Sequence, residues 1–278
     1  MKLGMNIRNW GPTAEPEFLR RCAEAADDST LDAIWFNDHI GLPPEIGENE
    51  YGIADDMGSI VDPLAFASFL AAVTERIRFG TAVLVLPYRP MIVTAKLLAS
   101  IQVLSGNRFL LGVGPGYLAE EFTALGVPRS RRGRITDETL SFIHAASEDP
   151  LIEMHGQPLF LRPRLSRPPI YVGGKAAVAI PRALRYGDGW MPVSLSPAEL
   201  APHAAALQDQ AHTMGRPAME VVAMKTLPLA ERAAACDLAH EYREAGVTHL
   251  VHTQAYESPN HYAEIVDILE REIGAAVR

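Results

Sequence analysis

The chain has 278 residues, of which 48% are hydrophobic and 21% charged, a composition typical of a globular protein with a large core. The formal net charge of −9 argues against general attraction to nucleic acid or an anionic membrane, and no apolar run approaches bilayer-spanning length. The two cysteines, Cys22 and Cys236, lie far apart without a CxxC spacing, so neither a disulfide framework nor a zinc site is expected.

Two features favour a cytoplasmic location. Both cysteines fall in apolar helical segments and are expected to be buried free thiols, as in a reducing compartment. The chain opens with a predicted strand at residues 2–7 and shows no charged segment, apolar core and cleavage site of a secretory signal.

Strand and helix patterns alternate along the first half of the chain. Asp62 as N-cap and Pro63 at the first helical position form a typical helix start. Between these elements lie a polar loop, a long connection with helical stretches, and an irregular Pro-rich segment. The expected strands are 2–7, 33–36, 77–85 and 109–113, the expected helices are 16–27, 91–104 and one from Asp62-Pro63, and the three connections are 41–61, 117–147 and 150–169.

The second half repeats the same alternation. Ser196-Pro197 begins one of its helices in the same way as Asp62-Pro63. The expected strands are 169–172, 189–192, 220–224 and 249–252, and the expected helices are 176–186, 198–214, 230–245 and 261–276.

Eight strand–helix units over this length predict an α/β fold, a (β/α)8 TIM barrel with a loop and helix insertion after strand four. A doubly wound open sheet is the alternative. No linker divides two cores, so residues 1–278 are expected to form a single domain. The connections at 41–61 and 117–169 are expected to cover the active-site face, since long connections in compact domains are often functional.

Polar residues follow the second predicted strand directly. In a barrel, Asp38 and His39 would lie on the rim at the carboxyl ends of the strands, where catalytic groups sit. An imidazole there is a candidate proton donor near neutral pH. The alternative is a rim histidine that only binds loop carbonyl groups.

Glycines follow strands four and five. The run Gly173-Gly174-Lys175 precedes a helix and predicts a phosphate site, with an ordinary turn as the alternative. It is not a dinucleotide fingerprint, because no GxGxxG is present. Gly112, Gly114 and Gly116 would let a ring system approach the backbone. No HExxH, GxSxG or Cys–His pattern appears, so no metal site is expected.

Taken together, these segments resemble the bacterial luciferase-like family of flavin- and deazaflavin-dependent oxidoreductases over nearly the whole chain. No one segment is decisive, but their order and spacing are specific to that family. They are Asn37-Asp38-His39, Thr74 to Thr81, Leu104 to Phe109, Gly112 to Phe122, Arg132-Gly133-Arg134, Val172-Gly173-Gly174 and Tyr186 to Trp190.

The resemblance implies a TIM barrel with an insertion, usually dimeric, that holds flavin or coenzyme F420 in its mouth. The ring would rest on strand three, where many members carry a bulge with a non-proline cis peptide, here Ala82–Val83. His39 matches a position beside the reactive ring and the substrate. The cofactor-binding residues would be Thr81, Ala82, Val83, Gly114, Gly116, Tyr117, Glu120, Gly173, Gly174, Lys175 and Ala176.

Two departures from related enzymes guide the choice of cofactor. Related sugar-phosphate dehydrogenases carry an acid where this chain has Tyr117, and the luciferase branch tends to carry a basic residue where it has Pro115. We therefore expect hydride transfer with coenzyme F420 to or from a small organic substrate, by a homodimer, with catalysis assigned to His39 and Asp38. The alternatives are an FMN-dependent monooxygenase with a separate flavin reductase and a non-catalytic flavin- or deazaflavin-binding barrel.

Overall fold

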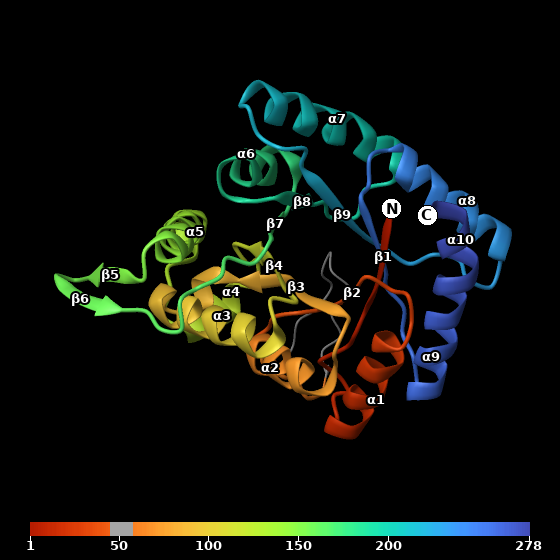
Figure 1. The fold of residues 1–278 in the computed structure, drawn as a ribbon, viewed down its shortest axis with the longest axis horizontal. Coiled ribbons are helices and arrows are strands. Elements are labelled where there is room, and N and C mark those ends of the chain that lie inside the picture. The colour runs from red at the N-terminus through yellow and green to blue at the C-terminus, as the bar shows by residue number, and fades with distance from the viewer. Residues whose placement is uncertain (45–57) are drawn as a thin grey trace.

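A barrel of eight parallel strands surrounded by helices forms the centre of the computed structural model, which describes residues 1–44 and 58–278 (Figure 1). The barrel strands are β1 (Lys2–Asn6), β2 (Ala33–Phe36), β3 (Arg78–Val85), β4 (Phe109–Gly114), β7 (Ile170–Gly173), β8 (Gly189–Met191), β9 (Glu220–Lys225) and β10 (His249–His252). Around the barrel they follow the order β1-β10-β9-β8-β7-β4-β3-β2 and close on themselves. The predicted TIM barrel is confirmed, and the open-sheet alternative is wrong.

Three helices in the described part of the chain, those that begin after Asp62, Ser196 and Ser258, have side-chain caps. The Asp62 side chain accepts hydrogen bonds from the backbone N–H groups of Leu64 and Ala65, and Ser196 forms a capping box with Glu199. The helices are α1 (Pro16–Asp27), α2 (Pro63–Val73), α3 (Met91–Ser105), α4 (Ala119–Ala124), α5 (Arg132–Glu148), α6 (Ala176–Tyr186), α7 (Pro197–Thr213), α8 (Arg232–Glu244), α9 (Pro259–Ile268) and α10 (Gly274–Val277). None of these helices is long and apolar enough to cross a membrane.

The insertion after β4 contains α4, α5 and an antiparallel hairpin of β5 (Leu151–Met154) and β6 (Gln157–Phe160). The expectation of an irregular segment from 150 was therefore wrong for this hairpin, which projects away from the barrel (Figure 1). Its two turn residues, His155 and Gly156, have φ of 53° and 78°, as tight two-residue hairpins require. Of the loop expected at 41–61, residues 45–57 lie outside the described part of the chain.

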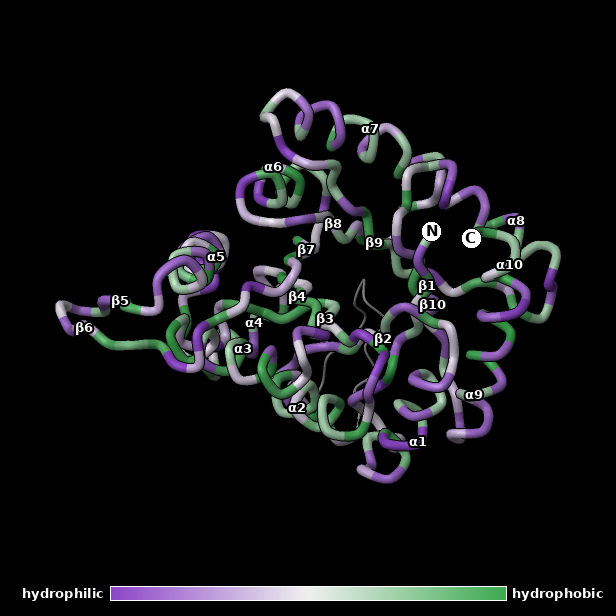
Figure 2. Tube along the Cα trace, viewed as in Figure 1, coloured by the Kyte–Doolittle hydropathy of each residue, from purple (hydrophilic) through white to green (hydrophobic). Residues whose placement is uncertain are grey.

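Side chains on the barrel strands alternate between two apolar layers. One layer packs against the helices, and the other, with Trp35, Leu110, Tyr171 and Met191, fills the barrel interior. Figure 2 shows helices of mixed hydropathy around the strands, as expected for helices with one face on the barrel. The interior is thus a packed floor, and the open space for chemistry is the mouth at the carboxyl ends of the strands.

Candidate active site

The residues that follow β2 point alternately into and out of the barrel. Trp35 belongs to the interior layer and Phe36 to the helix-facing layer, so the alternation directs Asn37 and His39 toward the mouth and Asp38 away from it. The Asn37 side-chain amide donates to the carbonyl oxygen of Ala82 over 3.1 Å, which ties the end of β2 to β3.

Asp38 is buried and lies in an ion network behind the rim. Its carboxylate accepts two hydrogen bonds from Arg89, at 2.7 and 2.8 Å, and one from the backbone N–H of Val85 at 2.8 Å. Arg89 also binds Asp62 at 2.6 Å. Burial raises the pKa of Asp38, and the hydrogen bonds from Arg89 oppose that rise. Asp38 therefore fixes the loops after β2 and β3 and has no path to a ligand in the mouth.

His39 is held by a different carboxylate, that of Glu121 on α4. The His39 Nδ1 lies 3.1 Å from the Glu121 Oε2, which also accepts from the Tyr88 hydroxyl at 2.7 Å. The other Glu121 oxygen accepts from the backbone N–H groups of Ile40 at 2.6 Å and Gly41 at 3.3 Å. The side chain of Glu121 is only 2% exposed, against 13% for His39.

These contacts determine the chemistry of the Glu121–His39 pair. Burial acts to raise the pKa of Glu121, but hydrogen bonds from His39, Tyr88 and Ile40 outweigh it and hold that pKa below the usual glutamate range. An ionised carboxylate can only accept hydrogen bonds, so the His39 nitrogen that faces it, Nδ1, carries the proton. The second ring nitrogen, Nε2, is the one that does not face Glu121. The His39 ring meets the ring of Tyr117 edge-on, with centroids 6.0 Å apart.

The expected ring-binding surface on β3 is irregular, as the resemblance implied. The Ala82–Val83 peptide bond is cis, and the register between β3 and β4 shifts between Thr81 and Leu84. Ala82 and Val83 both pack on the barrel-interior layer, while the Thr81 hydroxyl donates to the carbonyl of Gly112 over 2.7 Å.

Glycines on β4 and β7 accommodate Val83. A Cβ added at Gly114 would lie 2.6 Å from the Val83 Cγ2, and one at Gly173 would lie 2.7 Å from its Cγ1. Gly116, with φ of 77°, faces Val85 in the same way at 2.6 Å. The glycines thus leave room for Val83 and form with it an apolar bed at the mouth.

The turn after β7 leads into the start of α6. Gly174 has φ of 135°, its N–H donates to the carbonyl of Met191 over 3.1 Å, and its own carbonyl accepts from the Trp190 indole at 2.9 Å. Lys175 is the N-cap of α6 and supplies no side-chain cap. The N–H groups of Val178 and Ala179 donate to the carbonyl of Lys175, each over 3.0 Å, so those of Ala176 and Ala177 are the ones that could bind an anion, which the helix dipole favours there.

The structure brings most of the expected site residues to the mouth, but Asp38 is bound to Arg89 behind the rim and Glu120 points elsewhere. Glu120 is exposed on α4, whereas its neighbour Glu121 turns inward to His39. The sequence left open which of Glu120 and Glu121 turns inward, and it did not point to Tyr88 or Arg89. A signal for Glu121 existed: Leu118 and Phe122 are four apart and buried, which places the adjacent Glu121 near the inner face of α4.

The histidines on β10 are not available to the mouth. Burial lowers the pKa of His249 to about 4, and it lies at the opposite end of the strand, beside Tyr171. The Nδ1 of His252 accepts from the backbone N–H of Leu227 at 3.1 Å, and its Nε2 lies 3.0 Å from the Gln254 side-chain oxygen. Burial also lowers the pKa of His252. Both act as neutral structural groups.

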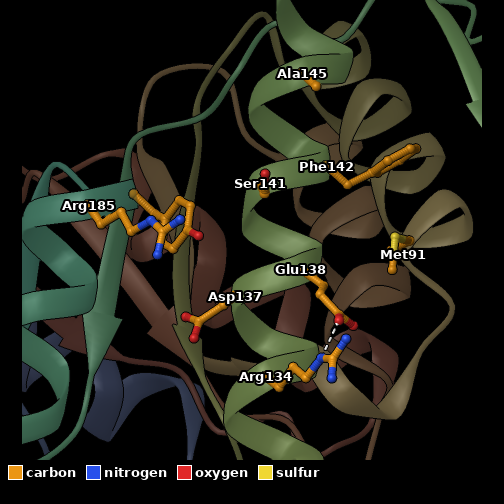
Figure 3. A pocket seen from close by; sticks show the side chains of 9 residues that line it. Met91, Arg134, Asp137, Glu138, Ser141, Phe142, Ala145 and Arg185 are labelled. Atoms are coloured by element: carbon orange, nitrogen blue, oxygen red, sulfur yellow. Dashed lines mark hydrogen bonds and ion pairs between the residues drawn. The ribbon is translucent and has the colours of Figure 1, made fainter.

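A surface hollow of about 610 Å³ lies away from the mouth, along α5 and beside the start of α3 and the end of α6 (Figure 3). Most of its charged groups are paired, Arg134 with Glu138 at 2.7 Å and Asp137 with Arg182 of α6 at 2.6 Å, while Arg185 lies over the Tyr186 ring at 4.9 Å. No group of three or more His, Cys, Asp or Glu side chains suited to a metal occurs among the described residues. We therefore place the candidate active site at the barrel mouth.

Comparison with known proteins identifies the family and the fold. A profile of the luciferase-like monooxygenase family matches residues 2–275. An uncharacterised protein of Mycobacterium tuberculosis is 33% identical over 191 residues, which cover 64% of this chain and 66% of that protein. The match therefore spans slightly less than two thirds of that relative.

Solved structures share the fold along the whole chain. The monooxygenase RslO1 from Streptomyces bottropensis has a TM-score of 0.81 at 16% identity over 99% of both chains. An F420-dependent secondary alcohol dehydrogenase in complex with an F420–acetone adduct has a TM-score of 0.78 at 17% identity, over 100% of this chain and 99% of that chain. The oxygenating constituent of a Pseudomonas putida 3,6-diketocamphane monooxygenase, in complex with FMN, has 0.77 at 12% identity over 100% and 99%. F420-dependent and FMN-binding proteins thus share this architecture.

Proposed function

This chain belongs to the luciferase-like monooxygenase family, and from that premise we propose that it is an oxidoreductase that uses coenzyme F420 to exchange a hydride with a small organic substrate. When bound, the deazaflavin would supply the hydride chemistry. The protein itself would bind the ring and the phosphate, exclude water and transfer a proton to or from the substrate.

The residues at the mouth fit such a cofactor. The bed of Val83, Gly114 and Gly173 is apolar, which suits a ring system that lies against the backbone. The uncapped N-terminus of α6, with Lys175 beside it, suits a phosphate group. The bed and the phosphate turn meet at Gly173, so one ligand with a ring and a phosphate would engage both.

His39 is the group that we assign to proton transfer. Glu121 fixes Nδ1, so Nε2 is the atom that would hold or release a proton toward the substrate. Tyr88 binds the same carboxylate oxygen, and burial raises the pKa of its phenol, which keeps it a donor. Asp38 is a positioning residue in this scheme, because Arg89 and Val85 occupy its carboxylate.

One observation carries the preference for F420: Pro115 occupies the position where the luciferase branch tends to carry a base for the flavin phosphate. The basic run Arg129 to Arg134 lies at the start of α5, where Gly133 and Asp137 contact Arg182 of α6, the helix that starts at the phosphate turn. A nearby cationic surface would favour the anionic oligoglutamate tail of F420.

The second candidate is an FMN-dependent monooxygenase supplied by a separate flavin reductase. The fold shared with an FMN-bound monooxygenase supports it. The two candidates are separated by parallel titrations of the purified protein with F420 and FMN at physiological salt, followed by reduction and reoxidation in air. Tighter binding of F420 is expected, and tighter binding of FMN would reverse the assignment.

We also propose that two copies of the chain associate through α3. This helix exposes Val93, Leu97, Val103 and Leu104, more apolar surface than a solvated helix face usually carries. A Leu104→Glu variant should run as a monomer in light-scattering chromatography, whereas the exposed-site control Glu120→Gln should match the parent.

A further inference from the structure

Arg8 lies on the inner side of the barrel rim. On β1 and the residue after it, Leu3, Met5 and Ile7 all belong to the helix-facing layer, so the alternation directs Gly4, Asn6 and Arg8 inward. Gly4 confirms this direction, because a Cβ added there would lie 3.2 Å from the indole of Trp35, an interior residue.

The neighbouring strand places Arg8 close to His39. β1 and β2 are parallel and pair Asn6 with Trp35, and the N–H of Ile7 donates to the carbonyl of Trp35 over 2.8 Å. The same register sets Arg8 level with Asn37, two residues before His39. Adjacent strands lie about 4.8 Å apart, so Arg8 and His39 face the same part of the mouth.

Aromatic rings hold the guanidinium of Arg8. Its central carbon lies 4.7 Å from the centroid of Trp10 and 6.0 Å from that of Tyr256, and the Tyr256 hydroxyl accepts from the Arg8 backbone N–H at 2.7 Å. Trp10 is itself fixed by a β-bridge to Ile60. A guanidinium stacked on a ring keeps its in-plane N–H edge free, the geometry that binds carboxylate or phosphate with two parallel hydrogen bonds.

The positive charge of Arg8 has no counterion within the described residues. Its Nε is buried and lacks a hydrogen-bond partner there, and burial lowers the pKa of Arg8. Three carboxylates on the described part of the rim already have partners: Asp38 and Asp62 bind Arg89, and Glu121 binds His39. Burying part of an unpaired cation is unfavourable unless a ligand supplies the missing charge.

The position of Arg8 separates it from the phosphate turn. In the strand order, β1 is four steps from β7 in either direction, so Arg8 and the turn at Gly173 lie on opposite sides of the mouth. A cofactor phosphate at the turn therefore leaves Arg8 for a second anion.

We propose that Arg8 forms an anion subsite for the substrate, so that the substrate carries a carboxylate or phosphate group that Arg8 binds while the reacting carbon lies beside His39. This rests on the proposed function for the reaction, but the subsite can be measured without it. The Trp10 ring beneath Arg8 also favours a substrate whose anionic group is attached to a flat or unsaturated portion.

The subsite is tested by titrating the full-length protein, without cofactor, with benzoate, inorganic phosphate and benzamide, the neutral counterpart of benzoate. The readout is the Nε–H resonance of Arg8 in ¹⁵N-arginine-labelled protein, assigned with Arg8→Gln. We expect benzoate or phosphate to shift this resonance saturably and benzamide to bind at least roughly tenfold more weakly. The anion that binds more tightly shows whether the subsite prefers a carboxylate or a phosphate group.

Variants complete the test. In tryptophan fluorescence, to which Trp10 contributes together with the buried Trp35 and Trp190, Arg8→Gln should weaken anion affinity by about 10–100-fold, while the surface variant Arg271→Gln should have no effect. Circular dichroism and thermal unfolding check that Arg8→Gln is folded. The proposal is overturned if neither anion shifts the Arg8 resonance. It is equally overturned if Arg8→Gln weakens F420 or FMN binding but leaves anion affinity unchanged. Failure of cofactor binding in the parent would reject the proposed function and leave the anion titration intact.

Discussion

Replacing Glu121 by Gln tests the central arrangement of the site, because Glu121 accepts hydrogen bonds from four donors. These are the Tyr88 hydroxyl, the His39 Nδ1–H and the backbone N–H groups of Ile40 and Gly41. Gln keeps the shape, but one carboxylate oxygen becomes an NH2 group. If the remaining oxygen stays with Ile40 and Gly41, the new NH2 faces two donors.

The stability lost in Glu121→Gln depends on which of the hydrogen-bonding groups around residue 121 can rearrange. Each hydrogen bond to a charged acceptor contributes about 1.5–3 kcal/mol, but the Tyr88 hydroxyl can rotate to accept from the NH2 group. His39 can accept as well if its proton moves from Nδ1 to Nε2. We therefore expect Glu121→Gln to lower the free energy of unfolding by about 2–3 kcal/mol and to switch the His39 tautomer. Denaturant unfolding measures the first, and ¹⁵N NMR of labelled histidine measures the second.

The stability difference should depend on pH in one direction. The folded-state pKa of Glu121 lies below the usual glutamate value. Its stabilisation is therefore complete above the unfolded-state pKa and is lost as the pH falls through the folded-state pKa. The gap between the parent and Glu121→Gln should thus narrow toward acid pH.

Glu120 gives a matched control, one residue away and exposed on the same helix. Glu120→Gln should change the unfolding free energy by less than about 0.5 kcal/mol and leave the His39 tautomer alone. If Glu121→Gln behaves like this control in both measurements, the hydrogen-bond account of His39 is refuted.

Substitutions at three further positions test other parts of the molecule. His39→Ala and His39→Asn should each lower turnover by about 10²–10⁴-fold while cofactor affinity changes little, and parent-level turnover across pH would assign the proton to another group. Gly174→Asp should abolish cofactor binding because its carboxylate repels the phosphate; the φ of 135° strains any side chain there, so Gly174→Asn is the uncharged control, and unchanged affinity of Gly174→Asp in a titration would remove the turn after β7 from the site. Asp188→Asn should cost about 1 kcal/mol at neutral pH, because the partly exposed Asp188 binds Arg167 and the N–H of Ile170. Burial acts to raise the pKa of Asp188, but the hydrogen bonds from Arg167 and Ile170 outweigh it and lower that pKa. The stability lost in Asp188→Asn should therefore shrink as the pH falls, and a loss that stays constant in acid unfolding experiments would contradict this role of Asp188.

The barrel was predictable because parallel strands are buried on both faces and read as short apolar runs. The predicted limits of 16–27, 33–36 and 176–186 coincide with α1, β2 and α6. The β5–β6 hairpin escaped prediction because its strands have only four residues each, β6 is exposed throughout, and Pro158 lies within it. Short exposed strands carry little periodic signal.

Features of the site that depend on backbone position could be predicted from the sequence. Features that depend on which side chains bind one another could not. The glycines beside Val83 and the turn at Gly174 follow from strand ends, which the sequence locates. The choice between Glu120 and Glu121 depends on the rotation of a six-residue helix, which one sequence hardly constrains. That Arg8 has no counterion among residues 1–44 and 58–278 depends on Asp38, Asp62 and Glu121, from distant segments, having other partners, a fact of tertiary structure alone.

Asp38 and His39 illustrate how sequence adjacency misleads on a strand. Neighbouring side chains leave opposite faces, so a carboxylate next to a histidine in sequence is the residue least able to reach it. Asp38 instead joins the loops after β2 and β3 through Arg89, and Glu121, 82 residues away, takes the place beside the imidazole. It follows that loss of Asp38 should disturb the rim as a whole, whereas loss of Glu121 should act on His39 itself. A double variant of Asp38 and His39 should then show additive effects on stability, while one of Glu121 and His39 should not.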